Sequence, residues 1–170
     1  VKQILAFSRR DSTRKRLVYL CRLVEENMKT WRSTIPSTVD VRVDIPARCR
    51  EDPPDCGMVR VDPTQIQQLL LNLCTNAVQA MEEKGSLSIT VREVVVAGGA
   101  GEPEAGLAPG TYERLTVSDT GCGMDRDTIG HIFDPFFTTK DAGSGTGMGL
   151  SVVHGIVTNH EAKILVDSVP

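Results

Sequence analysis

A long amphipathic pattern lies between two stretches in which apolar and polar residues alternate. From about Thr64 to Lys84 the apolar residues recur at helical spacing, and Gly85 is a suitable stop for a helix. Strand-like alternation precedes this helix at 39–45, and strand-like runs follow it at 87–91 and 94–96. An amphipathic helix must bury its apolar side against another layer, so this order predicts an α/β fold, a two-layer α/β sandwich.

The remaining patterns complete the expected order of elements. Asp62-Pro63 suits the start of the long helix, because proline fits the first turn of a helix. Further helices are expected over 1–10, 20–35, 127–133 and from about 150 onward, further strands over 58–61, 115–117 and 164–166, and irregular connections over 46–57 and 98–110.

Composition excludes several classes of protein. The 170 residues correspond to about one domain, and no apolar run reaches the roughly 18 residues of a membrane span. Residues 1–32 hold nine Lys or Arg against three acids, whereas the rest holds ten against nineteen. A basic arm on an acidic body can indicate nucleic-acid binding, but its aromatic residues form no stacking cluster, so no nucleic-acid partner is expected.

Cysteine usage predicts neither a disulfide framework nor a zinc site. The five cysteines are odd in number and form no CxxC pair. A reducing cytoplasm is therefore the expected location. Cys122, in the first glycine-rich segment, is interpreted as a small filler residue rather than a redox group.

Two glycine-rich segments, 119–123 and 143–149, suggest phosphate binding. A P-loop is excluded because Leu150, not lysine, follows Gly149, and the Gly-x-Gly-x-Gly spacing differs from the dinucleotide-binding motif. The His-Arg-Asp and Asp-Phe-Gly motifs of Ser/Thr/Tyr kinases are also absent from the sequence. What is left is a glycine loop that opens a helix, which can hold a polyphosphate or serve only as a surface turn.

Three polar residues add to this signal. Asn72 and Asn76 lie four residues apart on one side of the long helix, where an amide oxygen can complete a magnesium shell or serve a structural hydrogen bond. Asp119 ends a predicted strand before Gly121 and Gly123. Its carboxylate can accept from an exocyclic amino group of a base, or it can merely brace the turn.

Four sequence blocks occur in a fixed order that resembles the N, G1, F and G2 boxes of sensor histidine kinases, within the gyrase-like ATPase superfamily. The blocks are Asn72-Leu-Cys-Thr-Asn76-Ala-Val-Gln-Ala-Met81, Asp119-Thr-Gly-Cys-Gly-Met124, Phe133-Asp-Pro-Phe-Phe-Thr-Thr-Lys140 and Gly145-Thr-Gly-Met-Gly-Leu150. The resemblance covers about residues 58–167 and implies a mixed sheet covered by helices on one face. The opening segment, residues 3–10, resembles the end of the second dimerisation helix.

The resemblance also implies roles for residues. Asn76 would bind the Mg²⁺ that bridges the ATP phosphates, supported by Asn72, and Asp119 would read the adenine amino group. Lys140 would contact phosphate, and Phe136 or Phe137 would pack the lid. The other residues implied in nucleotide binding are the glycines Gly121 and Gly123 beside the base and Gly145, Thr146, Gly147, Gly149 and Leu150 of the phosphate loop.

By the same resemblance the chain would be the ATP-binding catalytic domain of a protein-histidine kinase. It would act with ATP and Mg²⁺, with the dimerisation domain of the same protein and with a response-regulator receiver domain, in a homodimeric parent. Family acceptor histidines precede this domain, so none of His131, His154 and His160 would be the acceptor, and the chain alone is expected to bind Mg-ATP without autophosphorylation.

Position 72 bears on the alternatives, a GHKL-type ATPase or a non-catalytic nucleotide-binding scaffold. Related ATPases carry a glutamate there that activates water, and Asn72 cannot act as a base, which favours phosphoryl transfer.

Residues 1–15 are expected to end the dimerisation helix and its linker, and 16–170 to form the catalytic domain without its final strand. Glu161-Ala162 replaces a glycine pair that is usual in the family, so an altered turn is expected there.

Overall fold

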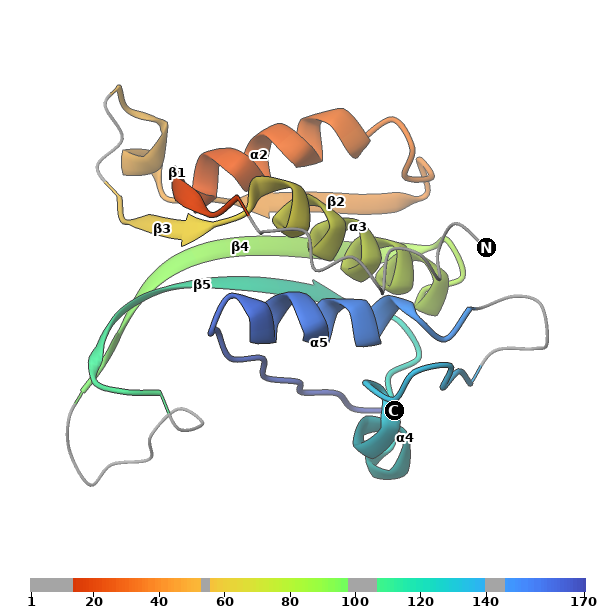
Figure 1. Cartoon of the computed structure of the whole chain (residues 1–170). Coiled ribbons are helices and arrows are strands. Elements are labelled where there is room, and N and C mark those ends of the chain that lie inside the picture. Colours follow the sequence, from red (N-terminus) through yellow and green to blue (C-terminus); the bar gives the residue numbers. More distant parts are fainter. Residues whose placement is uncertain (1–13, 53–55, 98–106, 140–145) are drawn as a thin grey trace.

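One long strand organises the structure. The computed structural model describes residues 14–52, 56–97, 107–139 and 146–170 of the chain (Figure 1). In it, β4 (Gly85–Val96) lies between β2 (Val39–Asp44) and β5 (Gly110–Asp119). The β2 strand runs parallel to β4 and β5 runs antiparallel to it, so the expected mixed sheet is confirmed.

Over residues 87–91, the β4 strand buries every second side chain. Leu87, Ile89 and Val91 are at most 1% exposed, and the residues between them are partly accessible. The two expected runs at 87–91 and 94–96 belong to this single strand, which corrects the sequence-based prediction. Arg92 interrupts the apolar pattern but not the ladder, since it pairs with Arg114 of β5 and its guanidinium donates to Asp44 of β2.

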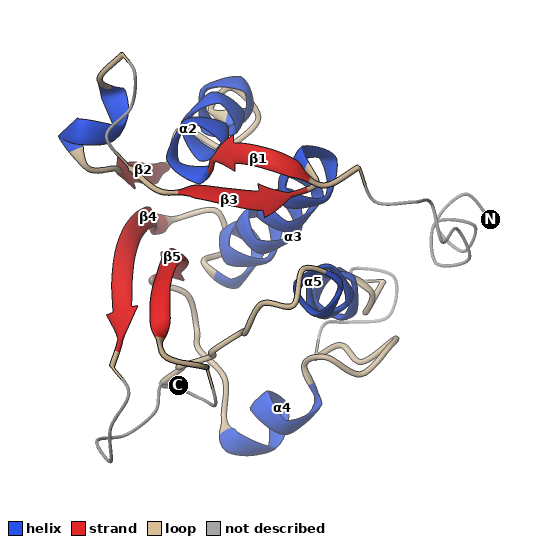
Figure 2. Cartoon of the chain, turned by 60° about the vertical axis from the view of Figure 1, so that its left-hand side comes forward, coloured by secondary structure: helices blue, strands red, loops and turns tan. Residues whose placement is uncertain are grey.

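Three helices cover one face of this sheet, as the two-layer prediction requires. They are α2 (Leu20–Trp31), α3 (Pro63–Ala80) and α5 (Gly149–Asn159), and Figure 2 shows all three on the same side of β2, β4 and β5. The main core joins α2 and α3 to the sheet, with Val24, Leu70 and Leu87 fully buried. A smaller cluster around Val153 packs α5 against α3, which brings a late segment of the chain beside an early one.

The long helix begins as predicted but ends earlier. The Asp62 carboxylate accepts a hydrogen bond from the Thr64 amide at 2.9 Å, with Pro63 in the first turn. The helix stops at Ala80 instead of Lys84, because Glu82 and Glu83 adopt left-handed φ values of 49° and 61°. The residue expected as the stop, Gly85, is instead the first residue of β4.

A small second sheet was not predicted in full. The expected strand at 58–61 is present as β3 (Met58–Val61), and it pairs antiparallel with β1 (Arg16–Tyr19). The sequence does not indicate β1, because its four residues are too few to show a period. The expected loop over 46–57 contains a short 3₁₀ helix, η1 (Ala47–Arg50), and the expected helix near 127–133 is α4 (Arg126–His131).

The strand expected at 164–166 is wrong. These residues leave α5 and pair with no described strand. Their chain runs instead toward the segment after β5, where the Ser168 hydroxyl accepts from the Met124 amide at 2.9 Å. Apolar residues alone do not make a strand without a neighbouring ladder, so β5 forms the edge of the sheet among the described residues.

Some predictions lie outside the described residues. They concern the helix at 1–10, most of the connection at 98–110, and the site residues Lys140 and Gly145. Among the helices that the structure describes, none is both long and apolar enough to span a bilayer.

Candidate nucleotide site

The amides of Asn72 and Asn76 face the start of α5. Both are half-buried on α3, one turn and about 6 Å apart along the axis. A methyl group added at Gly149 would lie 3.5 Å from Asn76 Nδ2, 3.6 Å from Asn76 Oδ1 and 3.9 Å from Asn72 Oδ1. Because Gly149 has no side chain, the two amides lie next to the backbone at the start of α5.

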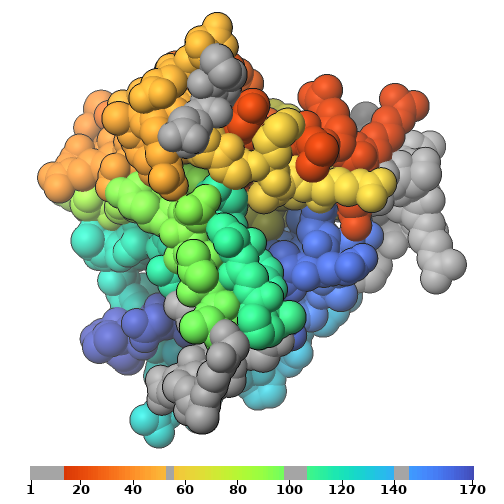
Figure 3. Space-filling model, turned by 90° about the vertical axis from the view of Figure 1, so that its left-hand side faces the viewer, coloured from red at the N-terminus to blue at the C-terminus, as the bar shows by residue number. Residues whose placement is uncertain are grey.

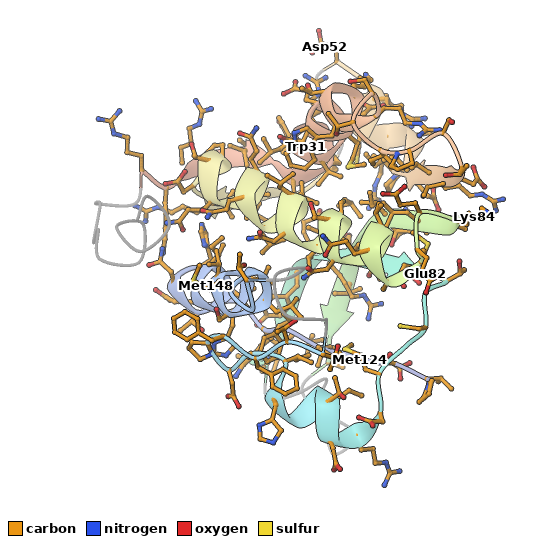
Figure 4. All side chains as sticks on the ribbon, turned by 90° about the vertical axis from the view of Figure 1, so that its right-hand side faces the viewer. Trp31, Asp52, Glu82, Lys84, Met124 and Met148 are labelled. Carbon is orange, nitrogen blue, oxygen red and sulfur yellow. The ribbon has the colours of Figure 1, made fainter. Side chains whose placement is uncertain are left out.

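That helix end is suited to an anion. The α5 helix has eleven residues and starts at Gly149, so its first amides have no partners within the helix. Aligned peptide dipoles also give this end a partial positive charge. Figure 4 shows α3 crossing above α5, with Met148 at the start of α5 and Glu82 just beyond the end of α3. Amide oxygens and an anion-binding helix end thus share one location.

Asp119 lies at the end of β5, where its carboxylate is exposed. Its Oδ1 accepts a hydrogen bond from the Gly121 amide at 2.8 Å, so Asp119 does brace the turn. A carboxylate has lone pairs to spare beyond this one bond. Bracing and recognition of an amino group are therefore compatible roles for the same side chain.

The turn after Asp119 is docked on the end of α3. The Cys122 amide donates to the Ala80 carbonyl at 3.1 Å. A methyl at Gly121 would lie 2.7–2.8 Å from Cβ, C and O of Ala80, so only glycine allows this approach. An open hollow of about 310 Å³ adjoins the contact; it is lined by Ala80, Met81, Glu82, Thr120, Gly121 and Cys122. Its lining residues include neither Asn76, which lies further back along α3, nor Gly149 at the start of α5.

Gly123 is not open to a ligand in this structure. Its φ is +69°, and a methyl added there would lie 1.9 Å from the Val169 carbonyl oxygen. Val169 and Pro170 therefore occupy the room expected for a base at this position.

The F and G2 segments are joined by their backbones. The Phe136 amide donates to the Gly147 carbonyl at 2.9 Å. Gly147 has a φ of +63°, and a methyl there would lie 2.4–2.6 Å from Phe136 backbone atoms. Phe136 has a φ of +70° and a side chain 71% exposed, whereas Phe137 is half-buried with its ring centroid 5.6 Å from that of His131. Of the two phenylalanines expected to pack the lid, only Phe137 is packed.

The three histidines are engaged in local contacts. His131 Nδ1 lies 2.7 Å from Asp134 Oδ2, and the His154 ring lies 5.1 Å from that of Phe133. His160 Nε2 accepts from the Asp62 amide at 3.0 Å while its Nδ1 donates to the Ile156 carbonyl at 2.8 Å. His160 thus fastens the end of α5 to the start of α3.

Sequence reasoning missed Thr120. Its hydroxyl oxygen accepts from the Ser86 amide at 3.0 Å and lies 3.6 Å from Met81 Sδ, so it links β4, α3 and the Asp119 turn. A threonine between an aspartate and a glycine looks like an ordinary turn residue, so the sequence holds no signal for this role. Of the other expected site residues, Thr146 is exposed and Leu150 is half-buried.

A family profile described as "Histidine kinase-, DNA gyrase B-, and HSP90-like ATPase" matches residues 61–170. Among curated relatives, "Sensor kinase CckA" of Brucella abortus (strain 2308) is 33% identical over 168 residues, 99% of this chain and 17% of that protein. "Signal transduction histidine-protein kinase AtoS" of Escherichia coli (strain K12) is 32% identical over 170 residues, 100% of this chain and 24% of that protein. The chain thus spans less than a quarter of either relative.

Solved structures agree in fold. The catalytic domain of histidine kinase ThkA, in a nucleotide-free form, has a TM-score of 0.64 and 27% identity, covering 86% of this chain and 81% of that one. A complex of ThkA with the response regulator protein TrrA matches with a TM-score of 0.63 and 23% identity, over 95% of this chain and 40% of that one.

Proposed function

Since the chain belongs to the family of histidine kinase-, DNA gyrase B- and HSP90-like ATPases, we propose that it is the ATP-binding catalytic domain of a two-component sensor histidine kinase. The observation that carries the proposal is the convergence of the Asn72 and Asn76 amides on Gly149 at the start of α5. This arrangement supports a triphosphate held between α3 and α5, with the base toward Asp119.

The proposed roles follow the geometry. The first amides of α5 would receive phosphate oxygens, and Gly147 and Gly149 would keep the phosphate loop close to α3. Asp119 would accept from the adenine amino group through an oxygen lone pair that the Gly121 amide does not use. For a base to enter beside Gly123, residues 168–170 would have to move aside. Lys140, Gly145, Thr146 and Leu150 keep their expected roles in phosphate contacts, and Phe137, the packed phenylalanine, keeps the expected role in the lid.

The asparagine oxygens fit Mg²⁺ only when the phosphate oxygens of a bound nucleotide supply further ligands. Mg²⁺ prefers oxygen ligands and is commonly held by one or two protein oxygens together with substrate phosphates. Asn76 Oδ1 is such an oxygen, and it lies beside the helix end that would hold those phosphates. Bound there, the ion would offset phosphate charge during transfer.

Asn72 bears on the type of reaction. An amide is not a base and cannot take a proton from water, so this position does not favour ATP hydrolysis. We propose that the γ-phosphoryl group passes to a histidine nitrogen of the parent's dimerisation helices, with ADP as the other product. The engaged positions of His131, His154 and His160 support an acceptor outside the described residues.

The remaining assignments concern the parent protein. We propose that residues 1–15 end the dimerisation region and that 16–170 form the catalytic domain, in a homodimeric, cytoplasmically facing kinase. ThkA, whose catalytic domain this chain resembles, has been crystallised with the response regulator TrrA. By analogy, we expect a receiver-domain aspartate to take the phosphoryl group next.

Calorimetric titration with a nonhydrolysable ATP analogue, with and without Mg²⁺, tests the proposal. The wild-type chain should bind more tightly with Mg²⁺ present. Asn76→Ala should remove most of that Mg²⁺-dependent gain, since it deletes the proposed oxygen ligand, at a cost of about tenfold or more in affinity.

Gln67→Ala provides the matched control. Gln67 is an exposed amide of α3, nine residues before Asn76 and therefore on the opposite side of the helix. Its loss should leave nucleotide affinity unchanged. Absence of nucleotide binding by the wild type would refute the proposal, and steady-state phosphate release by the wild type would favour the ATPase alternative.

A further inference from the structure

Three cysteines distant in the sequence meet in the fold. They come from the first turn of α2 (Cys21), from η1 (Cys49) and from the residues just before β3 (Cys56). Their sulfur atoms all lie within 4.8 Å of one another, and Cys21 Sγ and Cys56 Sγ are 3.2 Å apart. The spacings of 28 and 7 residues hide this cluster from sequence reasoning, which predicted no metal site.

The spacing suits three ligands of one small ion. Zinc–sulfur bonds are about 2.3 Å long, which places sulfur atoms that share an ion about 3.8–4.0 Å apart in tetrahedral or trigonal geometry. The Cys21–Cys56 separation of 3.2 Å is below that value and no pair exceeds 4.8 Å, so small rotations of the side chains would suffice. Within the described residues the group has no fourth His, Asp, Glu or Cys member.

The cluster is held together without an ion. The Arg22 guanidinium donates to the Glu51 carbonyl at 2.7 Å, and Arg50 Nε lies 3.3 Å from Glu25 Oε1, so η1 is tied to α2. Next to Cys56, the Gly57 amide donates to the Glu113 carboxylate of β5. A ligand would therefore find the three thiols already assembled, which lowers the ordering cost of binding.

The surroundings distinguish this cluster from a disulfide pair. Cys21 and Cys49 are buried, 2% and 3% exposed, and Cys56 is partly accessible, which leaves one side open to an incoming ion. All three are free thiols. A disulfide would join only two of the three sulfur atoms, whereas one ion can bind all three.

We propose that Cys21, Cys49 and Cys56 form a binding site for a soft, thiophilic metal ion of the Zn²⁺ or Cu⁺ class. Binding forms three metal–sulfur bonds and releases three thiol protons to solvent. Thiolate ligands select such ions over Mg²⁺, so the site is chemically distinct from the proposed nucleotide site. In Figure 4 Asp52, which lies between Cys49 and Cys56 in the chain, is at the top of the view, whereas Met148 at the start of α5 lies lower, beyond α3.

The site would join three elements that the chain connects only through loops. In Figure 3 the segment that follows β2 caps the upper end of the β4 and β5 strands, beside the red start of the described chain. A bound ion would link this segment, which contains η1, to α2 and to the residues just before β3. Bound metal should therefore stabilise the fold against unfolding, as any ligand specific to the native state does.

Titration of the whole 170-residue chain with Cd²⁺, in the presence of reductant that does not bind metal, tests the proposal. Cd²⁺ is an optical probe for a zinc-type thiolate site, because bound thiolates give a charge-transfer band in the ultraviolet. The band should saturate at one ion per chain, and Zn²⁺ should compete for the same site. Cys21→Ser and Cys49→Ser should each weaken binding by about 100-fold or more.

Two variants outside the cluster serve as controls. Cys74→Ala removes a buried thiol of α3 and Cys122→Ser removes an exposed one, and neither should change the stoichiometry or the affinity. Alkylation with mass analysis adds a readout that needs no variant: one equivalent of Cd²⁺ should protect Cys21, Cys49 and Cys56 together. A missing band, protection of other cysteines, or a wild-type affinity in Cys49→Ser would overturn the site; so would a Cys21–Cys56 disulfide formed in place of metal binding.

Discussion

Replacement of Gly121 by alanine tests whether the Asp119 turn must dock on α3. The added methyl would lie 2.7 Å from Ala80 Cβ and 2.8 Å from Ala80 C and O. These separations are roughly 0.7 Å shorter than a comfortable contact. Two of the three atoms belong to the helix backbone, so the turn has to move instead. Overpacking of this kind costs about 1–3 kcal/mol.

The displaced turn has a second consequence. Gly121 is linked to the Asp119 carboxylate by its amide, and Cys122 to the Ala80 carbonyl, so movement of the turn moves the proposed base-recognition group. A loss of about 1.4 kcal/mol in the docked state corresponds to a tenfold weaker nucleotide affinity. Urea unfolding followed by circular dichroism and calorimetric titration with the ATP analogue measure the two effects separately.

Gly155→Ala is the matched glycine control. Gly155 lies inside α5, and apart from its chain neighbours and the backbone of its own helix no described atom would lie within 4 Å of an added methyl. Alanine there should raise the free energy of unfolding by up to about 1 kcal/mol, because it favours the helix more than glycine does. Docking of the turn on α3 would be refuted if Gly121→Ala matched the wild type in both unfolding and nucleotide affinity.

Two further substitutions separate local geometry from ligand binding. Gly149→Ala should leave the fold intact, since its methyl would lie at an ordinary contact distance of 3.5 Å from Asn76. Nucleotide affinity should nevertheless fall by about tenfold, because the methyl fills the space between the amides and the helix end. Unchanged affinity in the same titration would argue against that space as the phosphate site. Glu161→Gly should raise the free energy of unfolding by about 1 kcal/mol, since Glu161 has a left-handed φ of 56° that L-residues adopt at a cost. Glu161→Ala retains the unfavourable φ, so its free energy of unfolding, measured with urea, should not rise. If both variants had the same free energy of unfolding, the left-handed φ could not be the cause.

At Glu161, backbone hydrogen bonds hold a conformation that is unfavourable for a residue other than glycine. The sequence predicted an altered turn where Glu161-Ala162 replaces the usual glycine pair. In the structure Glu161 adopts a left-handed φ of 56°, with its amide bonded to the Thr158 carbonyl at 3.0 Å and the Ala162 amide to the Val157 carbonyl at 3.1 Å. Backbone hydrogen bonds that close the end of α5 hold a conformation that the side chain itself disfavours.

Local features of the site were predictable from the sequence. The position of Asn72 and Asn76 on one side of a helix follows from their spacing of four residues, and the helix start at Asp62 follows from capping. The mixed sheet and the one-sided helical cover followed from the resemblance of the four blocks, which the family match confirms. Each of these features depends on neighbours within a few residues or on a motif of fixed order.

Other features depended on contacts between segments far apart in the chain. The register of β4 is set by its ladder, which continued through Arg92 where the hydrophobic pattern broke. The failed strand at 164–166 shows the reverse case, in which a strand-like composition found no ladder among the described residues. Pairing partners are chosen by the whole sheet, so composition alone could not decide either outcome.

The amino-acid order by itself determined where the long helix begins, which residues carry amide or carboxylate groups, and the family to which the motifs point. Only the tertiary structure decided that Gly149 meets Asn76, that Gly121 rests on Ala80, and that three cysteines share one small volume. Periodicity and capping act over one or two turns of chain. Proximity between distant segments arises only when the layers pack and exclude water from the surface between them.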